Sequence, residues 1–299
     1  MAERIPEFKE ILLDASKALA EFSGRTLDVL EVKQPSDTQY AIHLSKVVSK
    51  LSPIIGNMIE YSMVSFLNDN MKRENGTWIR QDPGFPDTIF NGPVNPTPGI
   101  EIKTWFPLAT EITARFKDSI THFAQGQTNV ALLAWVPEFI IFGQPKILDV
   151  WIDAAGGVAQ ARDSHYHNPP DYLVLEPEDT SKRTRNLQQT NTNGYKFQGT
   201  PADLAKAKKI VSSWGPDGRR FSHNPEYQAK LSKLMGRFKY RLDTNFAKMD
   251  RIQHTTLEQF KAKVLNSTMN GHAISRWAKV LSSPESSENI VLLQSLVKP

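Results

Sequence analysis

Two acidic residues and a lysine occur close together in the sequence, in a pattern that could bind a metal ion. Asp87 follows Pro86, and Glu101-Ile102-Lys103 begins 14 residues later. Side chains alternate between the two faces of a strand, so a strand here would place Glu101 and Lys103 on one face, about 7 Å apart. If the preceding strand pairs with it as a hairpin, Asp87 lies beside Glu101. The two carboxylates would then converge as Mg²⁺ ligands, with the carbonyl of Ile102 within reach, and such an ion can assist phosphodiester hydrolysis.

The residues around this motif indicate helices followed by a sheet. Helical spacing predicts three helices. The first ends near residue 24, the second begins at Ser36 and stops before Pro53, and the third runs over 54–70. Between residues 75 and 99, five prolines and four glycines break helices and mark the start of a sheet. Strands are predicted at 86–91, 99–106, 129–136 and 146–152, with a helix at 110–123. This order predicts an α/β fold, a mixed central β-sheet flanked by helices.

The distribution of charge separates the two ends of the chain. Residues 1–179 contain 15 Lys and Arg against 24 Asp and Glu, whereas residues 180–299 contain 21 against 8. The net charges are therefore −9 and +13. A basic C-terminal region is typical of proteins that bind a polyanion such as nucleic acid, although a solvated, lysine-rich helical surface would look the same.

The composition narrows the chemistry further. The 299 residues are 39% hydrophobic, which supports a real core, and they include no cysteine. A metal site must therefore use oxygen or imidazole ligands, which favours Mg²⁺. No apolar run is long enough to span a membrane and no signal-peptide pattern opens the chain, so we expect a cytoplasmic protein with no membrane partner.

The motif and the strand, strand, helix, strand order around it resemble the PD-(D/E)xK nuclease superfamily, specifically its type II restriction endonucleases. The resemblance rests on Pro86-Asp87 and Glu101-Ile102-Lys103 and covers roughly residues 54–155. It implies a restriction-endonuclease-like core in which Asp87 and Glu101 hold Mg²⁺. Lys103 would orient the attacking water or stabilise charge on the phosphate. Many members of this superfamily add a glutamate from a helix before the sheet, and Glu60 is the matching candidate.

A polar segment after the predicted sheet is the candidate for reading DNA sequence. Arg and Lys can bind guanine edges, and Asn or Gln can bind adenine. The candidate contacts there are Lys182, Arg183, Arg185, Asn191, Asn193 and Lys196. Arg219 and Arg220, with further lysines and the helix predicted over 225–249, are expected to contact phosphates. An ordinary exposed polar loop is the alternative for the segment.

These observations divide the chain into four regions. We expect N-terminal helices for dimerisation or sheet cover over 1–72, a catalytic α/β core over 73–160, a polar recognition segment over 161–200, and a basic helical region over 201–299. All four are also compatible with one compact domain.

The resulting hypothesis is a Mg²⁺-dependent endonuclease that cuts double-stranded DNA at specific sites and that, as the resemblance implies, is a homodimer. A repair nickase or structure-specific resolvase on the same fold is one alternative, and a non-catalytic DNA-binding protein is another. His165 and His167 flank Tyr166, but no third ligand at a recognisable spacing accompanies them, so a zinc site is disfavoured.

Overall fold

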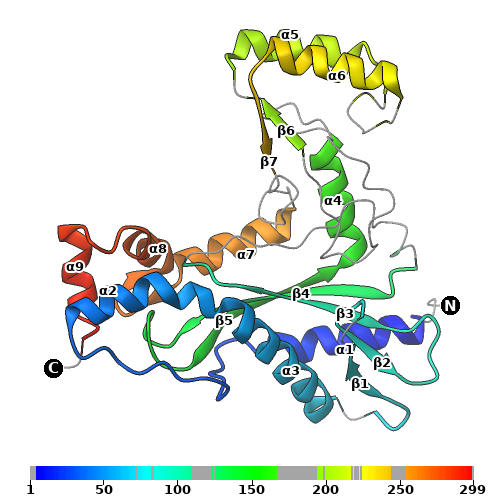
Figure 1. Ribbon diagram of the computed structural model, residues 1–299. Coiled ribbons are helices and arrows are strands. Elements are labelled where there is room, and N and C mark those ends of the chain that lie inside the picture. The colour runs from blue at the N-terminus through cyan, green and yellow to red at the C-terminus, as the bar shows by residue number, and fades with distance from the viewer. Residues whose placement is uncertain are drawn as a thin grey trace. The chain divides into compact units, whose positions relative to one another are not determined.

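The chain folds into two units, which are described separately. The computed structural model describes residues 5–71, 73–81, 84–108, 123, 125–167, 194–197, 199–216, 218, 222, 224–243 and 254–297, with side chains undescribed at 162–167, 194–196 and 241–243. The first unit comprises Met1–Ile112, Phe123–Gly156 and His254–Pro299, and the second comprises Thr113–His122 and Gly157–Gln253 (Figure 1). The region predicted over 201–299 is thus divided between the two.

A five-stranded mixed sheet forms the centre of the first unit. Its strands lie in the order β1-β2-β3-β4-β5, and all neighbours are antiparallel except β3 and β4. The bounds are β1 Thr77–Arg80, β2 Thr88–Asn91, β3 Gly99–Trp105, β4 Thr128–Pro137 and β5 Pro145–Ala154. The predicted α/β class and mixed sheet with flanking helices are confirmed. Strand β1 was not among the predicted strands.

Helices from both ends of the chain complete the first unit. The N-terminal ones are α1 Glu7–Ala20, α2 Thr38–Val47, the short 3₁₀ helix η1 Val48–Leu51 and α3 Ser52–Asn70, and the C-terminal ones are α7 Thr255–Asn266, α8 Ile274–Ser282 and α9 Ser287–Gln294. A short β-ribbon, β8 Thr268–Met269 with β9 His272–Ala273, connects α7 to α8. The helix predicted to begin at Ser36 begins two residues later, at Thr38, because the carboxylate of Asp37 accepts a hydrogen bond from the Tyr40 N–H and caps the helix.

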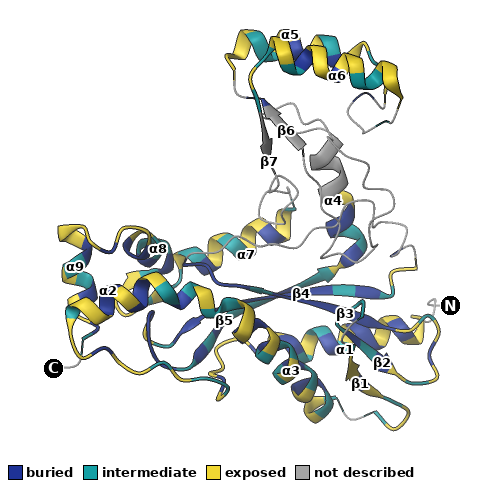
Figure 2. Cartoon of the chain, in the orientation of Figure 1, coloured by how far each residue is buried: buried dark blue, intermediate teal, exposed yellow. Residues whose placement is uncertain are grey.

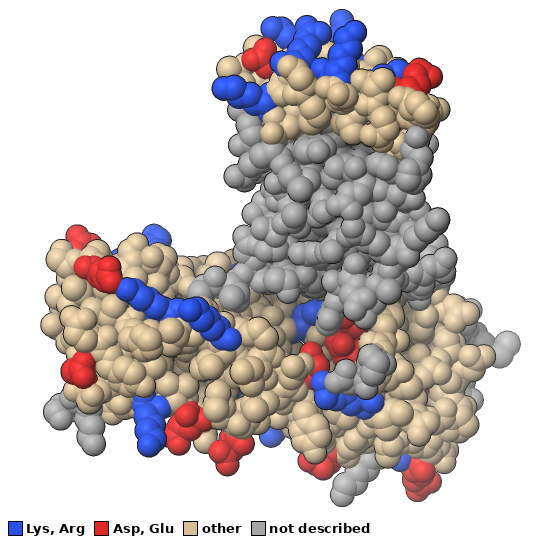
Figure 3. Space-filling model, viewed as in Figure 1, with Lys and Arg blue, Asp and Glu red and all other residues tan. Residues whose placement is uncertain are grey.

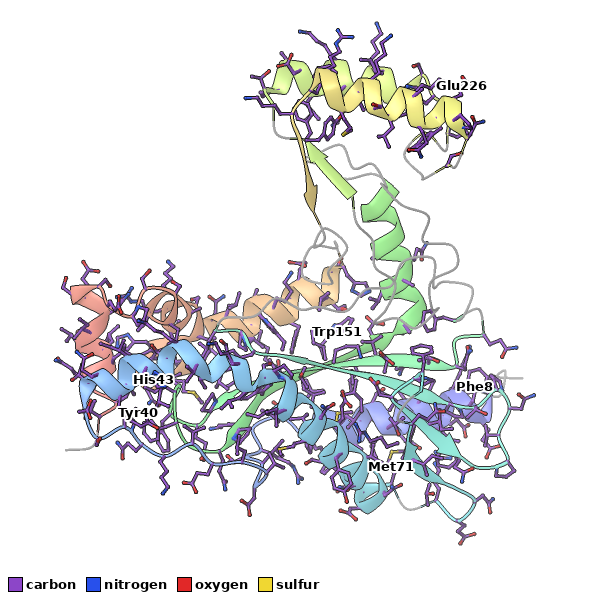
Figure 4. All side chains as sticks on the ribbon, viewed as in Figure 1. Phe8, Tyr40, His43, Met71, Trp151 and Glu226 are labelled. Atoms are coloured by element: carbon purple, nitrogen blue, oxygen red, sulfur yellow. The ribbon has the colours of Figure 1, made fainter. Side chains whose placement is uncertain are left out.

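Strand alternation determines which helices cover which face of the sheet. On β5, the indole of Trp151 donates to Thr256 of α7, and Asp149 pairs with Lys263 of the same helix (Figure 4). The intervening residues of β5 face the other way and pack with α1 in the main core. Across the paired strands β3, β4 and β5, Glu101 lies in line with Asp153, and Lys103 lies in line with Trp151. Both side chains are therefore on the face of the sheet that α7 covers. Figure 2 shows the buried centre of this sheet.

The second unit contains a β-ribbon and a pair of helices. Its described elements are most of α4 Ala155–His167, β6 Gly194–Phe197, α5 Pro201–Ser212, α6 Pro225–Arg237 and β7 Tyr240–Asp243, with β6 antiparallel to β7. A small core of its own consists of Phe197, Ala207, Val211, Leu231 and Leu234. None of the helices in the described ranges has the length and hydrophobicity needed to cross a membrane.

Two predictions for this unit were wrong. The helix predicted over 225–249 ends at Arg237, because Phe238 is extended and the chain continues as β7. The ring of Phe238 packs on Phe197, with 6.1 Å between centroids, so an aromatic contact with β6 takes the place of another helical turn. The stretch over 161–200, expected to lack regular structure, contains the end of α4 and all of β6. The helix predicted at 110–123 falls almost entirely outside the described residues.

Candidate active site

The register between β2 and β3 brings Asp87 to Glu101. The strands pair at Thr88–Ile100 and Ile89–Gly99, and one step further in that register places Asp87 opposite Glu101. The N–H of Asp87 donates to Glu101 Oε2 at 3.3 Å, and the N–H of Ile102 donates to Asp87 Oδ2 at 2.7 Å. The antiparallel pairing expected from the sequence is therefore confirmed. Two carboxylates are fixed side by side through backbone amides.

Lys103 lies at the centre of this arrangement. Its Nζ is 3.1 Å from Asp87 Oδ2, 2.6 Å from Glu101 Oε1 and 2.9 Å from the carbonyl oxygen of Ile102. Glu101 is 1% exposed and Lys103 is 8% exposed. A cation is thus surrounded by the three oxygen groups that the sequence pattern nominated as metal ligands. Buried charges persist in a fold only when they are paired and hydrogen-bonded in this way.

The chain before Asp87 is held against β3 by close packing. A Cβ on Gly99 would lie 2.3 Å from Cγ of Pro86, so only glycine at the start of β3 lets Pro86 approach this closely. The side-chain amide of Gln81 donates to the Pro86 carbonyl at 2.9 Å, and the N–H of Gln81 donates to the Asp87 carbonyl at 2.8 Å. The position of Asp87 is therefore determined by the backbone on both sides of it.

Helix α3 brings Glu60 to the same site. A Cβ on Gly56 would lie 2.9 Å from the hydroxyl of Thr104, so glycine permits a close approach of α3 to β3 one turn before Glu60. Arg80, at the end of β1, pairs with Glu60 at 3.5 Å. Asn68 bonds both the N–H and the carbonyl of Trp78, each at 2.8 Å, which fixes β1 to α3. The short β1 and its Arg80 were missed in the sequence, although Trp78-Ile79-Arg80 alternates as a strand does.

Burial controls the ionisation of the site. It raises the pKa of Glu101 to about 7, with Lys103 opposing the rise and Asp87 adding to it. Burial by itself lowers the pKa of Lys103, but the charges of Glu101 and Asp87 outweigh it and raise that pKa above its usual value. Burial and the charge of Asp87 also raise the pKa of Glu60. Lys103 is therefore a cation at neutral pH, whereas Glu101 ionises close to neutrality.

The donor set fits a hard divalent cation. Asp87, Glu101 and the Ile102 carbonyl supply oxygen atoms, which Mg²⁺ prefers, and Mg²⁺ commonly uses only one or two carboxylates together with water and substrate phosphate. Buried Oε1 of Glu101 has Lys103 at ion-pair distance but accepts no aligned hydrogen bond. No group of three or more His, Asp or Glu side chains at metal-binding distance occurs in the described part of the chain, so a site here would use two carboxylates and the carbonyl.

Comparison of the chain with protein-family models, with curated protein sequences and with solved structures found no match. The interpretation of the site therefore rests on its own geometry. Four predicted residues, Glu60, Asp87, Glu101 and Lys103, are brought into one electrostatically connected group, together with the Ile102 carbonyl.

The predicted DNA-binding residues cannot be placed in the same way. Lys196 lies in β6, and its side chain is not described. The others fall outside the described residues: Lys182, Arg183, Arg185, Asn191, Asn193, Arg219 and Arg220. Their assignment remains a prediction.

Proposed function

We propose that this protein is a site-specific endonuclease that hydrolyses phosphodiester bonds of double-stranded DNA with Mg²⁺, in the manner of a type II restriction enzyme with a restriction-endonuclease-like core. The observation that carries the proposal is the convergence of Asp87, Glu101 and Lys103 through contacts of 2.6 to 3.3 Å in a buried corner of the sheet. Burial of a carboxylate and an ammonium beside a second, partly buried carboxylate is costly, and such arrangements concentrate at functional sites.

The residues of this corner have separate roles. Asp87, Glu101 and the Ile102 carbonyl would hold Mg²⁺, which when bound can polarise a phosphate oxygen and lower the pKa of a water molecule. Lys103 keeps its positive charge because two carboxylates face it, so it can donate a hydrogen bond to a nucleophilic water or to a phosphate oxygen. Glu60, paired with Arg80, lies close enough for its pKa to respond to both Asp87 and Lys103, so it can help to position water at the site.

The choice of DNA as substrate is supported by charge. Residues 180–253, which lie within the second unit, contain 16 Lys and Arg against five Asp and Glu. Figure 3 shows basic side chains gathered over the α5–α6 helices. A cationic surface of this kind attracts a polyanion and releases its counterions, which supplies affinity that does not depend on sequence.

The decisive experiment incubates the purified protein with a long DNA of known sequence, once with Mg²⁺ and once with EDTA, and sequences the fragment ends. Discrete ends that appear only with Mg²⁺ would support the proposal and give the target and stagger. Asp87→Ala should remove this cleavage, while Asp69→Ala, an exposed aspartate on α3, should retain it.

Other outcomes assign the alternatives. Nicked circles without double-strand breaks would indicate a nickase, and cleavage restricted to branched DNA would indicate a resolvase. Binding without any Mg²⁺-dependent cleavage would indicate a non-catalytic DNA-binding protein. The proposed homodimer is tested by the sedimentation mass of the protein alone and on a duplex that contains the identified site.

A further inference from the structure

A cleft of 640 Å³ opens in the second unit where α5 begins and α6 ends. Its lining residues come from the end of β6, the first two turns of α5 and the connection from α6 to β7, namely Phe197, Gly199, Thr200, Asp203, Lys206, Arg237, Phe238 and Lys239. Three of these side chains are cations and one is an anion. A cleft with a positive excess and an aromatic wall differs from the flat basic surface of a solvated helix.

The aromatic wall depends on a glycine. A Cβ on Gly199 would lie 2.5 Å from the Phe197 ring, so glycine lets the chain fold tightly over that ring before α5 begins. Phe197 also contacts Phe238 and Tyr240, with 6.1 Å and 5.3 Å between ring centroids. These contacts join β6 to β7 and fix the position of the residue that precedes Phe238, which is Arg237.

Arg237 is the cation best placed to bind a ligand. Its guanidinium lies over the Phe238 ring, 5.3 Å from the ring centroid, so part of its conformational freedom is already lost. A guanidinium has a planar fork of donors that matches the oxygens of a phosphate. Lys239, two residues further along, is exposed and lines the same cleft.

Among the described residues that line the cleft, Asp203 is the acidic one, and it is already engaged. Asp203 accepts a hydrogen bond from the Thr200 hydroxyl at 2.8 Å and pairs with Lys206 Nζ at 3.4 Å. The Thr200 hydroxyl in turn accepts from the N–H of Asp203 and caps α5. Asp203 therefore holds Lys206 at the cleft, and the four ionisable side chains carry a net charge of +2.

From these contacts we infer that the cleft is a binding site for a phosphate of the DNA backbone, with Arg237, Lys206 and Lys239 as its donors. This inference rests on the proposed function for the choice of DNA. It assigns the cleft a positioning role, since phosphate contacts fix the register of a protein on a duplex without reading bases. Lys206, Arg237 and Lys239 line the cleft and can bind one phosphate together. Basic residues of α5 and α6 outside the cleft attract DNA only through their general positive charge.

The test compares two triple variants of the full chain that remove the same charge. The cleft variant is Lys206→Gln with Arg237→Gln and Lys239→Gln. The matched control is Lys209→Gln with Lys230→Gln and Lys233→Gln, three exposed lysines of the same two helices that do not line the cleft. Affinity for a fluorescent duplex of about 30 base pairs is measured by anisotropy in EDTA, which prevents cleavage, over a range of salt concentrations.

We expect the cleft variant to bind the duplex about 10-fold to 100-fold more weakly than the control variant, because charge-assisted contacts are lost rather than only diffuse attraction. The salt dependence should also flatten by roughly 0.9 per lost phosphate contact. Thermal melts of all variants verify that the helices remain folded.

If both triple variants lost affinity for the duplex equally, the proposed phosphate site would be overturned. That result would show that only the general positive charge of the helices contributes to binding. Equal competition by an RNA duplex of the same length would overturn the assignment to DNA. Failure of the proposed function is a separate result: a protein that cleaves no DNA but loses affinity through the cleft variant would keep the phosphate site and lose the nuclease.

Discussion

The two units use charge in opposite ways. In the first, Glu101 and Lys103 are buried at 1% and 8% exposure and contact each other at 2.6 Å. In the second, the lysines of α5 and α6 are largely exposed, and a typical pair is Lys230 with Glu226 at the start of α6 (Figure 4). Buried charges interact strongly over short distances, whereas exposed charges are screened and act together over a surface.

Under the proposed function, this contrast amounts to a division of labour within one chain. A buried corner in which each charge has a partner can hold reacting groups in place. The free-energy cost of removing these charges from water is offset only when they are closely paired and hydrogen-bonded. In an exposed pair of basic helices the charges stay in contact with water and have no desolvation cost, and they raise the local concentration of a polyanion. Variants in the first unit should therefore change the rate of cleavage, and variants in the second should change affinity.

The largest effect is expected from Lys103→Met, which keeps the length of the side chain and removes its charge. Cleavage should fall about 100-fold to 1,000-fold, because the donor to water or phosphate is lost and the Asp87 and Glu101 carboxylates lose their counter-charge. Binding to DNA in EDTA should stay within about threefold of the wild type, since the basic second unit is untouched. Initial rates and anisotropy on the same preparation measure both quantities.

Lys33→Met is the matched control, because Lys33 is exposed in the first unit and remote in sequence from the motif. A Lys103→Met protein that cleaves at the normal rate would end the proposed role of this lysine. If that variant unfolds early in a thermal melt, Asp87→Asn tests the same corner with a nearly isosteric change that removes one negative charge.

The next effect concerns pH. Glu101 has a pKa of about 7, so below that pH its carboxyl is protonated and a poor ligand for Mg²⁺. At limiting Mg²⁺, cleavage should rise about tenfold per pH unit below pH 7 and level off above it. Excess Mg²⁺ should move the midpoint to lower pH, because the metal competes with the proton. A profile that is flat through neutrality would remove Glu101 from the proposed set of ligands.

The stability of the fold should change with pH in the opposite direction to cleavage, because of the same residue. The pKa of Glu101 in the folded protein is raised above the usual 4.5, so its favourable contribution is complete below that pH and is lost as the pH rises through about 7. A corner of the sheet that becomes more competent for metal as it becomes less stable is consistent with a functional site. Urea denaturation across this range, without metal, measures the trend.

Salt should affect the second unit more than the first. Each phosphate that the second unit neutralises should lower the affinity roughly 3.5-fold between about 50 mM and 200 mM NaCl, and the effects of several phosphates multiply. The single-turnover cleavage rate of DNA that is already saturated with protein should change less than about threefold, because buried pairs are weakly screened. Equal sensitivity of affinity and rate would contradict the division between the units.

Local patterns predicted the parts of the fold that local interactions determine. The buried stripe of α1, the helix α3 and the strands β3 to β5 all follow from spacing and apolar runs. The site itself was predictable for a related reason: alternation places Glu101 and Lys103 on one face whatever surrounds them. Their meeting with Asp87 depended on strand pairing, which the register confirms.

Elements that depend on distant partners were missed. Strand β6 pairs with β7 more than 40 residues away, so nothing near Gly194–Phe197 signals its partner. At the end of α6, the residues Leu234, Phe238 and Leu242 keep a helical spacing, and this pattern competed with the alternation of apolar and charged residues over 238–243. The packing of Phe238 on Phe197 decided in favour of a strand.

The smallest effect compares one glycine from each unit. Gly99→Ala places a Cβ 2.3 Å from Pro86, whereas Gly236 in α6 has no atom within 4 Å of the added carbon. Gly99→Ala should therefore lower the free energy of unfolding by about 1–3 kcal/mol. It should also slow cleavage about tenfold, because Pro86 moves and carries Asp87 away from Glu101. Gly236→Ala should stabilise the helix by up to about 1 kcal/mol and leave cleavage unchanged. Urea denaturation and initial rates check both variants. A Gly99→Ala protein with wild-type stability and rate would show that the approach of Pro86 to β3 does not position the site.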